Sequence, residues 1–594
     1  MEPLKRSSGI LAPLFSLPGV RDVGSLGRCA RAFVDFLSSA RQTWFQTLPI
    51  NPVDSFGSPY AGRSAFAGET LYLDLEDFCA EGLLDAADLT TSWTLPQSFE
   101  VRSSSRPQRD ARSERINYRA TFRRRRPCWQ KAFERYSSGR GGSKYRREEE
   151  RFRAENADWL DDYALFQAAT NEFGATDWRK WPEPIRRRDP GALAEFAQAR
   201  DRELEYARFL QLAFDVQWRE FRTYCSSRGV RIFGDVPIYV GGTSVDVWSH
   251  PELFQVDADG RVVREAGVPS DDFNKDGQRW GSPVYRWERH KEDNFQWHRR
   301  RMKKTLSRFD VVRLDHFIGY YNFYSFPGDG IDPMTDVQGG APSAITSDGE
   351  RVYDDGWEPG PQEAFFDAIF SECPREAFVA EDLGVMNKGV ETLRDRYGLL
   401  GMKVFQFSFD GVTIDKRTGR APNPITSWPE NYVAYTGTHD GAPVLGWLDD
   451  VRRFSGSSCN SLDFAGIRDV LERYRQEDDV PAFVPRVRSD ECWVSEFFRK
   501  PIGFNRQKMG VSSKFRAMAP EIAELRIAAL RAVASSACKL AIFPIQDVIG
   551  LSNDSRVNYP GVGVGNWTWR LGPRQLDEST ISELARLTLE TNRI

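Results

Sequence analysis

Phe309-Asp310-Val311-Val312-Arg313-Leu314-Asp315 is a short, largely apolar run that stops abruptly on an acidic residue. The pattern recurs in Ala377-Phe378-Val379-Ala380-Glu381 and in Tyr432-Val433-Ala434-Tyr435-Thr436-Gly437-Thr438-His439-Asp440. Continuous runs of β-branched and aromatic residues are typical of strands buried on both faces, as in parallel sheets covered by helices. In a (β/α)8 barrel the residue that ends such a strand lies at the mouth where the active site is built. The three runs therefore predict a (β/α)8 barrel that presents carboxylates at its mouth.

Carboxylates that converge on one cleft indicate chemistry at glycosidic bonds, in which one acts as nucleophile and another as acid/base. Arg313 precedes Asp315 by two residues and shares its side of the strand, so it would hold Asp315 ionised, as a nucleophile requires. Burial of Glu381 behind its apolar run would raise its pKa, which suits a proton donor. The alternatives are a helix N-cap for Asp315 and an ordinary loop acid for Glu381.

The composition of the chain indicates which classes of partner it binds and in which cellular compartment it works. The chain has 594 residues, of which 40% are hydrophobic, and its 81 basic and 85 acidic residues nearly balance. This balance gives no global field toward nucleic acid or a membrane. The eight cysteines form no CxxC pair, and no apolar window approaches the length of about 20 residues that spans a membrane. We therefore expect reduced thiols, no leader peptide and a cytoplasmic location.

The pattern along the chain predicts one catalytic barrel over residues 1–594 with two insertions. Residues 84–189 carry Trp, Phe and Tyr at helical spacing, which predicts a helical insertion subdomain. Residues 241–300 are rich in Gly, Pro, Asp and Trp without clear periodicity, which predicts a loop-rich insertion over the active site, anchored by tryptophans. Residues 452–520 are charged and interrupted by Gly, Pro and Ser, and no role is predicted for them.

Other chemistries have weaker support. The chain has five histidines, and His250, His290 and His298 lack metal-site spacing, so we expect them to be structural or on the surface and expect no metal. The Gly339-Gly340 pair is followed by no GK[ST] sequence, so no phosphate cradle is indicated. Basic runs at 123–126 and 144–147 lie in the helical segment, and Glu148 to Glu150 follow the second, which favours a solvated helix face over nucleic-acid binding.

A series of ordered motifs carries a family resemblance. They are Arg6-Ser7-Ser8-Gly9, Ser16-Leu17-Pro18-Gly19, Ser58-Pro59-Tyr60, Ser64-Ala65-Phe66-Ala67-Gly68, Gly234-Asp235-Val236-Pro237-Ile238-Tyr239, Asp246-Val247-Trp248, Ala266-Gly267-Val268-Pro269, Gly277-Gln278-Arg279-Trp280-Gly281, Arg313-Leu314-Asp315-His316-Phe317, Ala380-Glu381-Asp382-Leu383-Gly384, Gly437-Thr438-His439-Asp440, Gln546-Asp547, Asn558-Tyr559-Pro560-Gly561 and Gly565-Asn566-Trp567. Together they resemble the 4-α-glucanotransferases called amylomaltases or disproportionating enzymes, glycoside hydrolase family 77.

The resemblance implies an α/β fold with a (β/α)8 TIM barrel of the α-amylase type and large insertions. It also implies transfer of α-1,4-glucan segments from a glucan donor to a sugar acceptor through a covalent glycosyl-enzyme intermediate, without a cofactor. By motif, Asp315 corresponds to the nucleophile, Glu381 to the acid/base and Asp440 to the group that stabilises the transition state. The implied substrate-binding residues are Tyr60, Asp235, Gln278, Trp280, Arg313, His316, His439 and Asn558.

Some positions differ from the family pattern. Gly441-Ala442-Pro443 follows Asp440 where the family has Asn-Asp-Thr, and the other departures are Phe45, Ala61, Thr243 and Asp272. Two alternatives therefore stay open beside the transferase, namely an amylase-like α-glucan hydrolase and a glucan-binding protein whose catalysis has decayed. The sequence leaves the oligomeric state and the preferred chain lengths undetermined.

Overall fold

The computed structural model describes residues 4–18, 23–54, 56–90, 115–269, 277–328, 356–384, 387–455, 462–476, 520–562, 565–572 and 575–593. The Gly339-Gly340 pair, Asp272 and most of residues 477–520 lie outside these ranges. Within the described residues, no helix is both long enough and apolar enough to cross a membrane.

Eight parallel strands among the described residues form the central sheet, in the order β10-β11-β12-β1-β2-β3-β6-β9. Every neighbouring pair in this order is parallel. The strands are β1 (Ser7–Leu11), β2 (Trp44–Gln46), β3 (Arg231–Val236), β6 (Val311–Leu314), β9 (Phe378–Ala380), β10 (Gly401–Val404), β11 (Tyr432–Tyr435) and β12 (Leu540–Pro544). The predicted fold is confirmed, and Asp315 and Glu381 each follow directly on a buried strand.

The two ends of this sheet, β9 and β10, meet along a seam that is joined differently from the other strand pairs. One parallel bridge links Val379 to Leu400, and Ala380 N donates to Leu400 O at 2.8 Å. Beside it, the buried Asp382 side chain accepts a hydrogen bond from the backbone N–H of Met402 at 2.7 Å. Asp382 also forms an ion pair with the buried Arg394. A side chain therefore supplies part of the bonding that closes the barrel.

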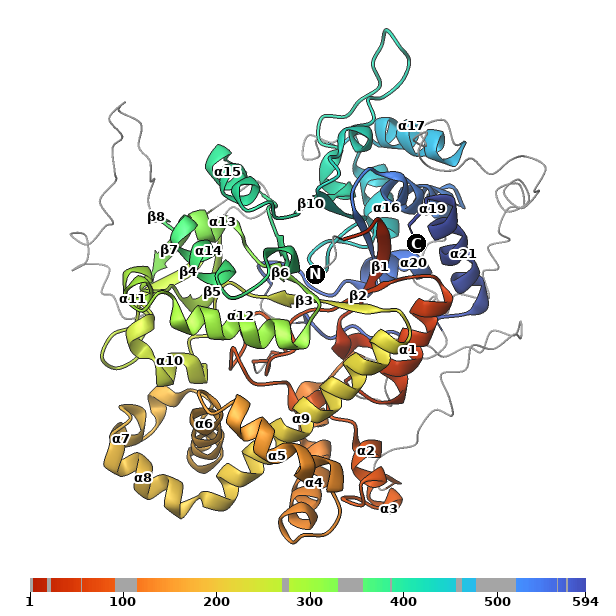
Figure 1. The fold of residues 1–594 in the computed structure, drawn as a ribbon. Helices are drawn as coiled ribbons and strands as arrows, with labels where there is room; N and C mark the ends of the chain where they lie inside the picture. Colours follow the sequence, from red (N-terminus) through yellow and green to blue (C-terminus); the bar gives the residue numbers. More distant parts are fainter. Residues whose placement is uncertain are drawn as a thin grey trace, which may run out of the picture.

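Helices surround the sheet (Figure 1). Apolar stripes on the longer helices are buried; α1, for example, buries Ala30, Phe33, Val34, Phe36 and Leu37 and packs on β2. The helices around the barrel are α1 (Arg28–Ser39), α9 (Asp201–Ser227), α12 (Gln296–Arg308), α13 (Ile318–Tyr321), α14 (Gln362–Phe370), α15 (Lys388–Arg396), α16 (Val444–Phe454), α17 (Phe464–Arg475), α19 (Pro520–Ser535), α20 (Ile545–Ile549) and α21 (Glu578–Glu590).

A group of helices between β2 and α9 occupies the bottom of Figure 1, and α9 runs from this group to the barrel. Helices α4, α5, α6 and α8 all pack on α9. The group consists of α2 (Leu75–Ala80), α3 (Ala86–Thr90), α4 (Tyr118–Ser137), α5 (Ser143–Glu155), α6 (Leu160–Phe173), α7 (Glu183–Arg186) and α8 (Pro190–Ala199). The basic runs lie on α4 and α5, where Lys144 pairs with Asp77 and Glu220.

The segment 241–300 is more regular than its sequence indicates. It contains α10 (Val245–Ser249), β4 (Arg264–Val268), β5 (Gln278–Pro283), α11 (Trp287–Glu292) and the start of α12. Strands β4 and β5 join β7 (Asn322–Pro327) and β8 (Trp357–Pro359) in an antiparallel sheet of order β5-β4-β7-β8. The sequence shows no clear periodicity in this segment because glycine and proline interrupt the strands and their partner β7 lies about 60 residues farther along the chain.

Gly9 provides a test of the barrel's packing. It faces Trp44 across the β1–β2 pair, and a Cβ at Gly9 would lie 2.4 Å from the backbone oxygen of Trp44. We expect Gly9→Ala to lower the free energy of unfolding by about 1–3 kcal/mol, because backbone must move to admit the methyl group. Gly62→Ala is the matched control, since its Cβ would meet nothing closer than 3.8 Å. Equal urea midpoints for the two variants would contradict the close packing of β1 on β2.

Candidate active site

Arg313 is the centre of the site. It lies on β6 opposite Asp235 on β3, where the two are registered partners. Arg313 Nε donates to Asp235 Oδ1 at 3.0 Å, and the Tyr60 hydroxyl donates to Asp235 Oδ2 at 2.6 Å. Arg313 Nη2 also reaches the Tyr60 oxygen at 3.3 Å. Because Arg313 and Asp235 are only 5% and 3% exposed, each needs the other to offset the loss of hydration.

The predicted contact between Arg313 and Asp315 is confirmed, since Arg313 Nη2 donates to Asp315 Oδ1 at 2.6 Å. Burial raises the pKa of Asp315 above its ordinary value, the Arg313 cation opposes this rise, and the charge of Asp440 adds to it. Arg313 therefore offsets part of the cost of an ionised Asp315, while the second carboxylate works against it.

Glu381 follows β9 and is held by two backbone amides. Its Oε2 accepts from His316 N at 2.7 Å, and its Oε1 accepts from Leu383 N at 3.2 Å. His316 has a φ of 49°, a left-handed conformation that is uncommon outside glycine, and its backbone amide is the donor that reaches the carboxyl group. Burial raises the pKa of Glu381 to about 8, against the opposing effect of Arg313. This direction matches the sequence-based expectation for a proton donor.

Asp440 lies beyond the end of β11 in a turn. His439 Nε2 lies 3.2 Å from Asp440 Oδ2, and Asn558 Nδ2 donates to Asp440 Oδ1 at 2.6 Å. The His439 ring stacks on Tyr60, with ring centres 5.2 Å apart and planes 6° apart. Tyr60 thus links the Asp440 side of the site to the Arg313 side.

Trp280 and Gln278 reach the site from β5 of the second sheet. The Trp280 ring meets His316 edge to face at 4.9 Å, and Trp280 Nε1 lies at 3.5 Å from Gln278 Oε1. The predicted residues therefore form two connected series of contacts. The first runs from Gln278 and Trp280 through His316 to Glu381. The second begins at Asp315, the neighbour of His316, and runs through Arg313 and Tyr60 to His439, Asp440 and Asn558. The individual roles assigned to them stay predictions.

Three further residues border the site although the sequence assigned them no role there. Trp567 packs its ring near Tyr60 and His439, at 5.6 and 6.0 Å, with a φ of 62° that is rare for a bulky residue. Gln406 donates to the backbone oxygen of Ala442 at 2.7 Å. Arg556 donates to the backbone oxygen of Asp440 at 2.6 Å. The sequence motif around Trp567 was visible, whereas the backbone contacts of Gln406 and Arg556 have no sequence signature.

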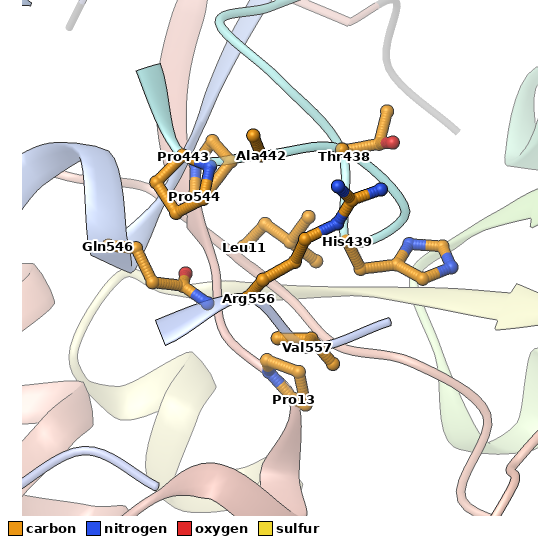
Figure 2. A pocket seen from close by; sticks show the side chains of 11 residues that line it. Leu11, Pro13, Thr438, His439, Ala442, Pro443, Pro544, Gln546, Arg556 and Val557 are labelled. Atoms are coloured by element: carbon orange, nitrogen blue, oxygen red, sulfur yellow. The ribbon is translucent and has the colours of Figure 1, made fainter. Parts of the chain in front are cut away.

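A small cavity lies beside the Asp440 turn, and Arg556 is among the residues that line it. Figure 2 shows Arg556 crossing it, between Thr438 and His439 on one side and Pro13 and Val557 on the other. Gly441, Ala442 and Pro443, which depart from the family pattern, form part of the lining of the same cavity as Arg556.

The remaining histidines lie apart from this site. His290 and His298 are buried against Tyr285 and Trp287, as a structural role predicts. His250 is partly exposed beside Glu252. Among the described residues, no group of three or more His, Cys, Asp or Glu side chains is arranged to hold a metal ion.

The pKa of Glu381 has a measurable consequence for stability. A carboxyl whose folded pKa is raised to about 8 favours folding below its unfolded pKa, and this contribution is lost as the pH rises through about 8. As the pH rises from 5 to 8, we expect the melting temperature of Glu381→Gln to increase relative to that of the unchanged protein. Above pH 8 the difference between the two melting temperatures should stay constant. The exposed Glu376→Gln is the control. A difference for Glu381→Gln that does not vary with pH would show that this carboxyl is not perturbed.

Comparison with known proteins gives the family. The sequence profile described as 4-alpha-glucanotransferase, glycoside hydrolase family 77, matches residues 12–575. The chain is 33% identical to the 4-alpha-glucanotransferase of Thermus thermophilus over 100% of both chains. It is 31% identical to that of Streptococcus pneumoniae, with 99% of this chain and 98% of the relative covered.

Solved structures agree with the sequence match. The amylomaltase from Streptococcus agalactiae in complex with acarbose has a TM-score of 0.76 and 29% identity, with 99% of this chain and 100% of that chain covered. The amylomaltase from Corynebacterium glutamicum, at 16% identity and a TM-score of 0.69, shares the fold over 99% of this chain and 75% of its own. Because one family profile spans most of the sequence and a relative more than 30% identical matches it from end to end, this chain belongs to the 4-alpha-glucanotransferases of glycoside hydrolase family 77.

Proposed function

We propose that this protein transfers α-1,4-glucan segments between maltooligosaccharides or longer glucans by a retaining double displacement. The observation that carries the mechanism is the pairing of two carboxyl groups in different environments. Asp315 accepts a hydrogen bond from a buried arginine, while the pKa of Glu381 is raised to about 8 by burial. Two carboxyl groups whose surroundings differ in this way suit the roles of nucleophile and acid.

In the first step, an oxygen of Asp315 attacks the anomeric carbon of the donor. The glycosidic bond breaks, and the protonated Glu381 gives its proton to the departing oxygen, so that a shortened glucan leaves and a covalent glycosyl ester remains. Asp440 stabilises the transition state by accepting hydrogen bonds from sugar hydroxyls. The amides of His316 and Leu383 keep the Glu381 carboxyl oriented through both steps.

In the second step, the ionised Glu381 takes the proton of the acceptor's 4-hydroxyl, whose oxygen attacks the anomeric carbon of the ester. The bond from that carbon to the Asp315 oxygen breaks, which releases the Asp315 carboxylate. Transfer rather than hydrolysis requires that a bound sugar outcompete water, which an acceptor held in attack geometry can achieve. We assign this holding to Trp280, with Gln278, because its ring lies against His316, the residue after the nucleophile. Tyr60 would stack on the sugar at the cleavage point.

We also propose that the helices within 84–189 form an insertion subdomain, that segment 241–300 covers the active site, and that the protein is cytoplasmic. Trp280 in the second segment contacts His316, which supports its place at the site. The cysteines in the described part of the chain are free thiols, and burial raises the pKa of Cys225 and Cys538, which suits reduced, unreactive side chains.

Incubation with maltotriose alone tests the reaction. We expect a ladder of longer maltooligosaccharides together with free glucose. Asp315→Ala should lower the transfer rate by at least about 10⁴-fold, because it removes the nucleophile, while leaving glucan binding nearly intact. Asp410→Asn, an exposed acid after β10, should be unaffected. Maltose and glucose without longer products would mean a hydrolase, and no products at all would mean a glucan-binding protein with decayed catalysis.

A maltosyl donor with a fluoride leaving group separates the roles of the two acids. Fluoride departs without a proton, so Glu381→Gln should still form the glycosyl ester but lack the base that resolves it, with turnover of maltotriose reduced by about 10²–10⁴-fold. We expect intact-mass measurement to show a maltosyl adduct on Glu381→Gln and none on Asp315→Ala. An adduct on Asp315→Ala would assign the nucleophile to another residue.

A further inference from the structure

The turn that carries Asp440 lacks polar side chains that could anchor it after the acid. Gly441, Ala442 and Pro443 follow Asp440 directly. The Asp440 side chain is 44% exposed, so packing alone does not fix its orientation. Within the turn, Asp440 N donates to Thr438 Oγ1 at 3.3 Å. Since a glycine widens the choice of backbone conformations, contacts from other segments must help to fix the position of Asp440.

Arg556 supplies contacts of this kind. Its Nη2 donates to the backbone oxygen of Asp440 at 2.6 Å, and its Nε donates to the backbone oxygen of Asn558 at 2.8 Å. Asn558 in turn donates through its side chain to the Asp440 carboxylate at 2.6 Å, and its backbone N–H donates to His439 O at 3.2 Å. One planar guanidinium therefore fixes both the backbone of Asp440 and the residue that orients its carboxylate.

The guanidinium is itself held in place. Its central carbon lies 4.4 Å from the centre of the Tyr559 ring, a cation–π geometry. Burial lowers the pKa of Arg556, and the charge of Asp440 opposes this shift. On the far side of the turn, Gln406 donates to Ala442 O, and a Cβ at Gly441 would lie 3.0 Å from Gln406 Oε1. Two side chains from different segments, Gln406 and Arg556, therefore hold the backbone of this turn.

We propose that Arg556 is a positioning residue for the reaction, which holds Asp440 in the geometry that stabilises the transition state and acts only through Asp440 and Asn558. This inference rests on the proposed function of Asp440. A displacement of about 1 Å at a catalytic group can reduce a rate by about 10²-fold, so loss of the guanidinium is expected to lower kcat more than it changes KM.

The cavity beside Arg556 provides a direct test. Removal of the Arg556 side chain would leave a space the size of its own guanidinium group in the wall of this cavity, which a small planar ion can occupy (Figure 2). We expect Arg556→Ala to lower kcat for maltotriose transfer by about 10–100-fold. Added guanidinium ion should restore part of this loss, because it can reach the same carbonyl oxygens, whereas methylammonium at equal concentration should not.

Arg115→Ala is the matched control. Arg115 also donates to backbone oxygens of the segment that carries Arg556, those of Asp554 and Gly565, but it is exposed and makes no contact with Asp440. It should leave kcat and the guanidinium response unchanged. If Arg556→Ala does not fold, Arg556→Lys serves instead. Lysine keeps the charge but lacks the fork that spans two carbonyl oxygens, so kcat should still fall with KM nearly constant.

The outcomes separate this inference from the function on which it rests. If the unchanged protein makes no transfer products, the proposed function is overturned. If the unchanged protein makes transfer products and Arg556→Ala has the same kcat, only the positioning role of Arg556 is overturned. A loss of activity that guanidinium does not relieve, matched by an equal loss in Arg115→Ala, would also overturn it, because the effect would then be a general disturbance of the segment.

Discussion

A single buried cation organises the mouth of this barrel. Arg313 on β6 holds Asp235 on the neighbouring strand, Asp315 two residues along its own strand, and the hydroxyl of Tyr60. Without it, the buried Asp235 and the partly buried Asp315 would share the barrel mouth with no cation to compensate them, which is more costly than an exposed pair of acids. The register of β3 on β6 fixes which acid faces the arginine, so the strand pairing and the electrostatics of the site are one constraint.

The site combines parts with different kinds of support. Asp315 and Glu381 follow barrel strands directly, and ladder hydrogen bonds fix their backbones, since Glu381 N donates to Leu314 O and Asp315 N donates to Val236 O. Asp440 lies farther from its strand, in a turn stabilised by Asn558 and Arg556 from a segment more than a hundred residues away. The first two positions depend on the sheet, whereas the third depends on side-chain contacts over a long range in sequence.

The strands that end on acids could be read from sequence because buried parallel strands leave continuous apolar runs, and the Arg313–Asp315 contact followed from the two-residue period of a strand. The sheet of β4, β5, β7 and β8 could not, since its short strands contain glycine and proline and pair across long loops. The same holds for Arg556, which acts on backbone oxygens that carry no residue identity. The rise in the pKa of Asp315 depends on burial and on Asp440, both set by the folded chain.

The seam between β9 and β10 is held by fewer strand-to-strand contacts than the rest of the barrel wall. Neighbouring strands elsewhere share several registered residues, but here one bridge and the buried Asp382–Arg394 pair complete the closure. Glu381 is the residue next to Asp382. Local opening requires less free energy where fewer contacts are lost, so an opening along this seam would displace the acid/base at a lower cost than a loss of core packing. We therefore expect the Asp382–Arg394 pair to bear directly on how long the acid/base stays in place at elevated temperature.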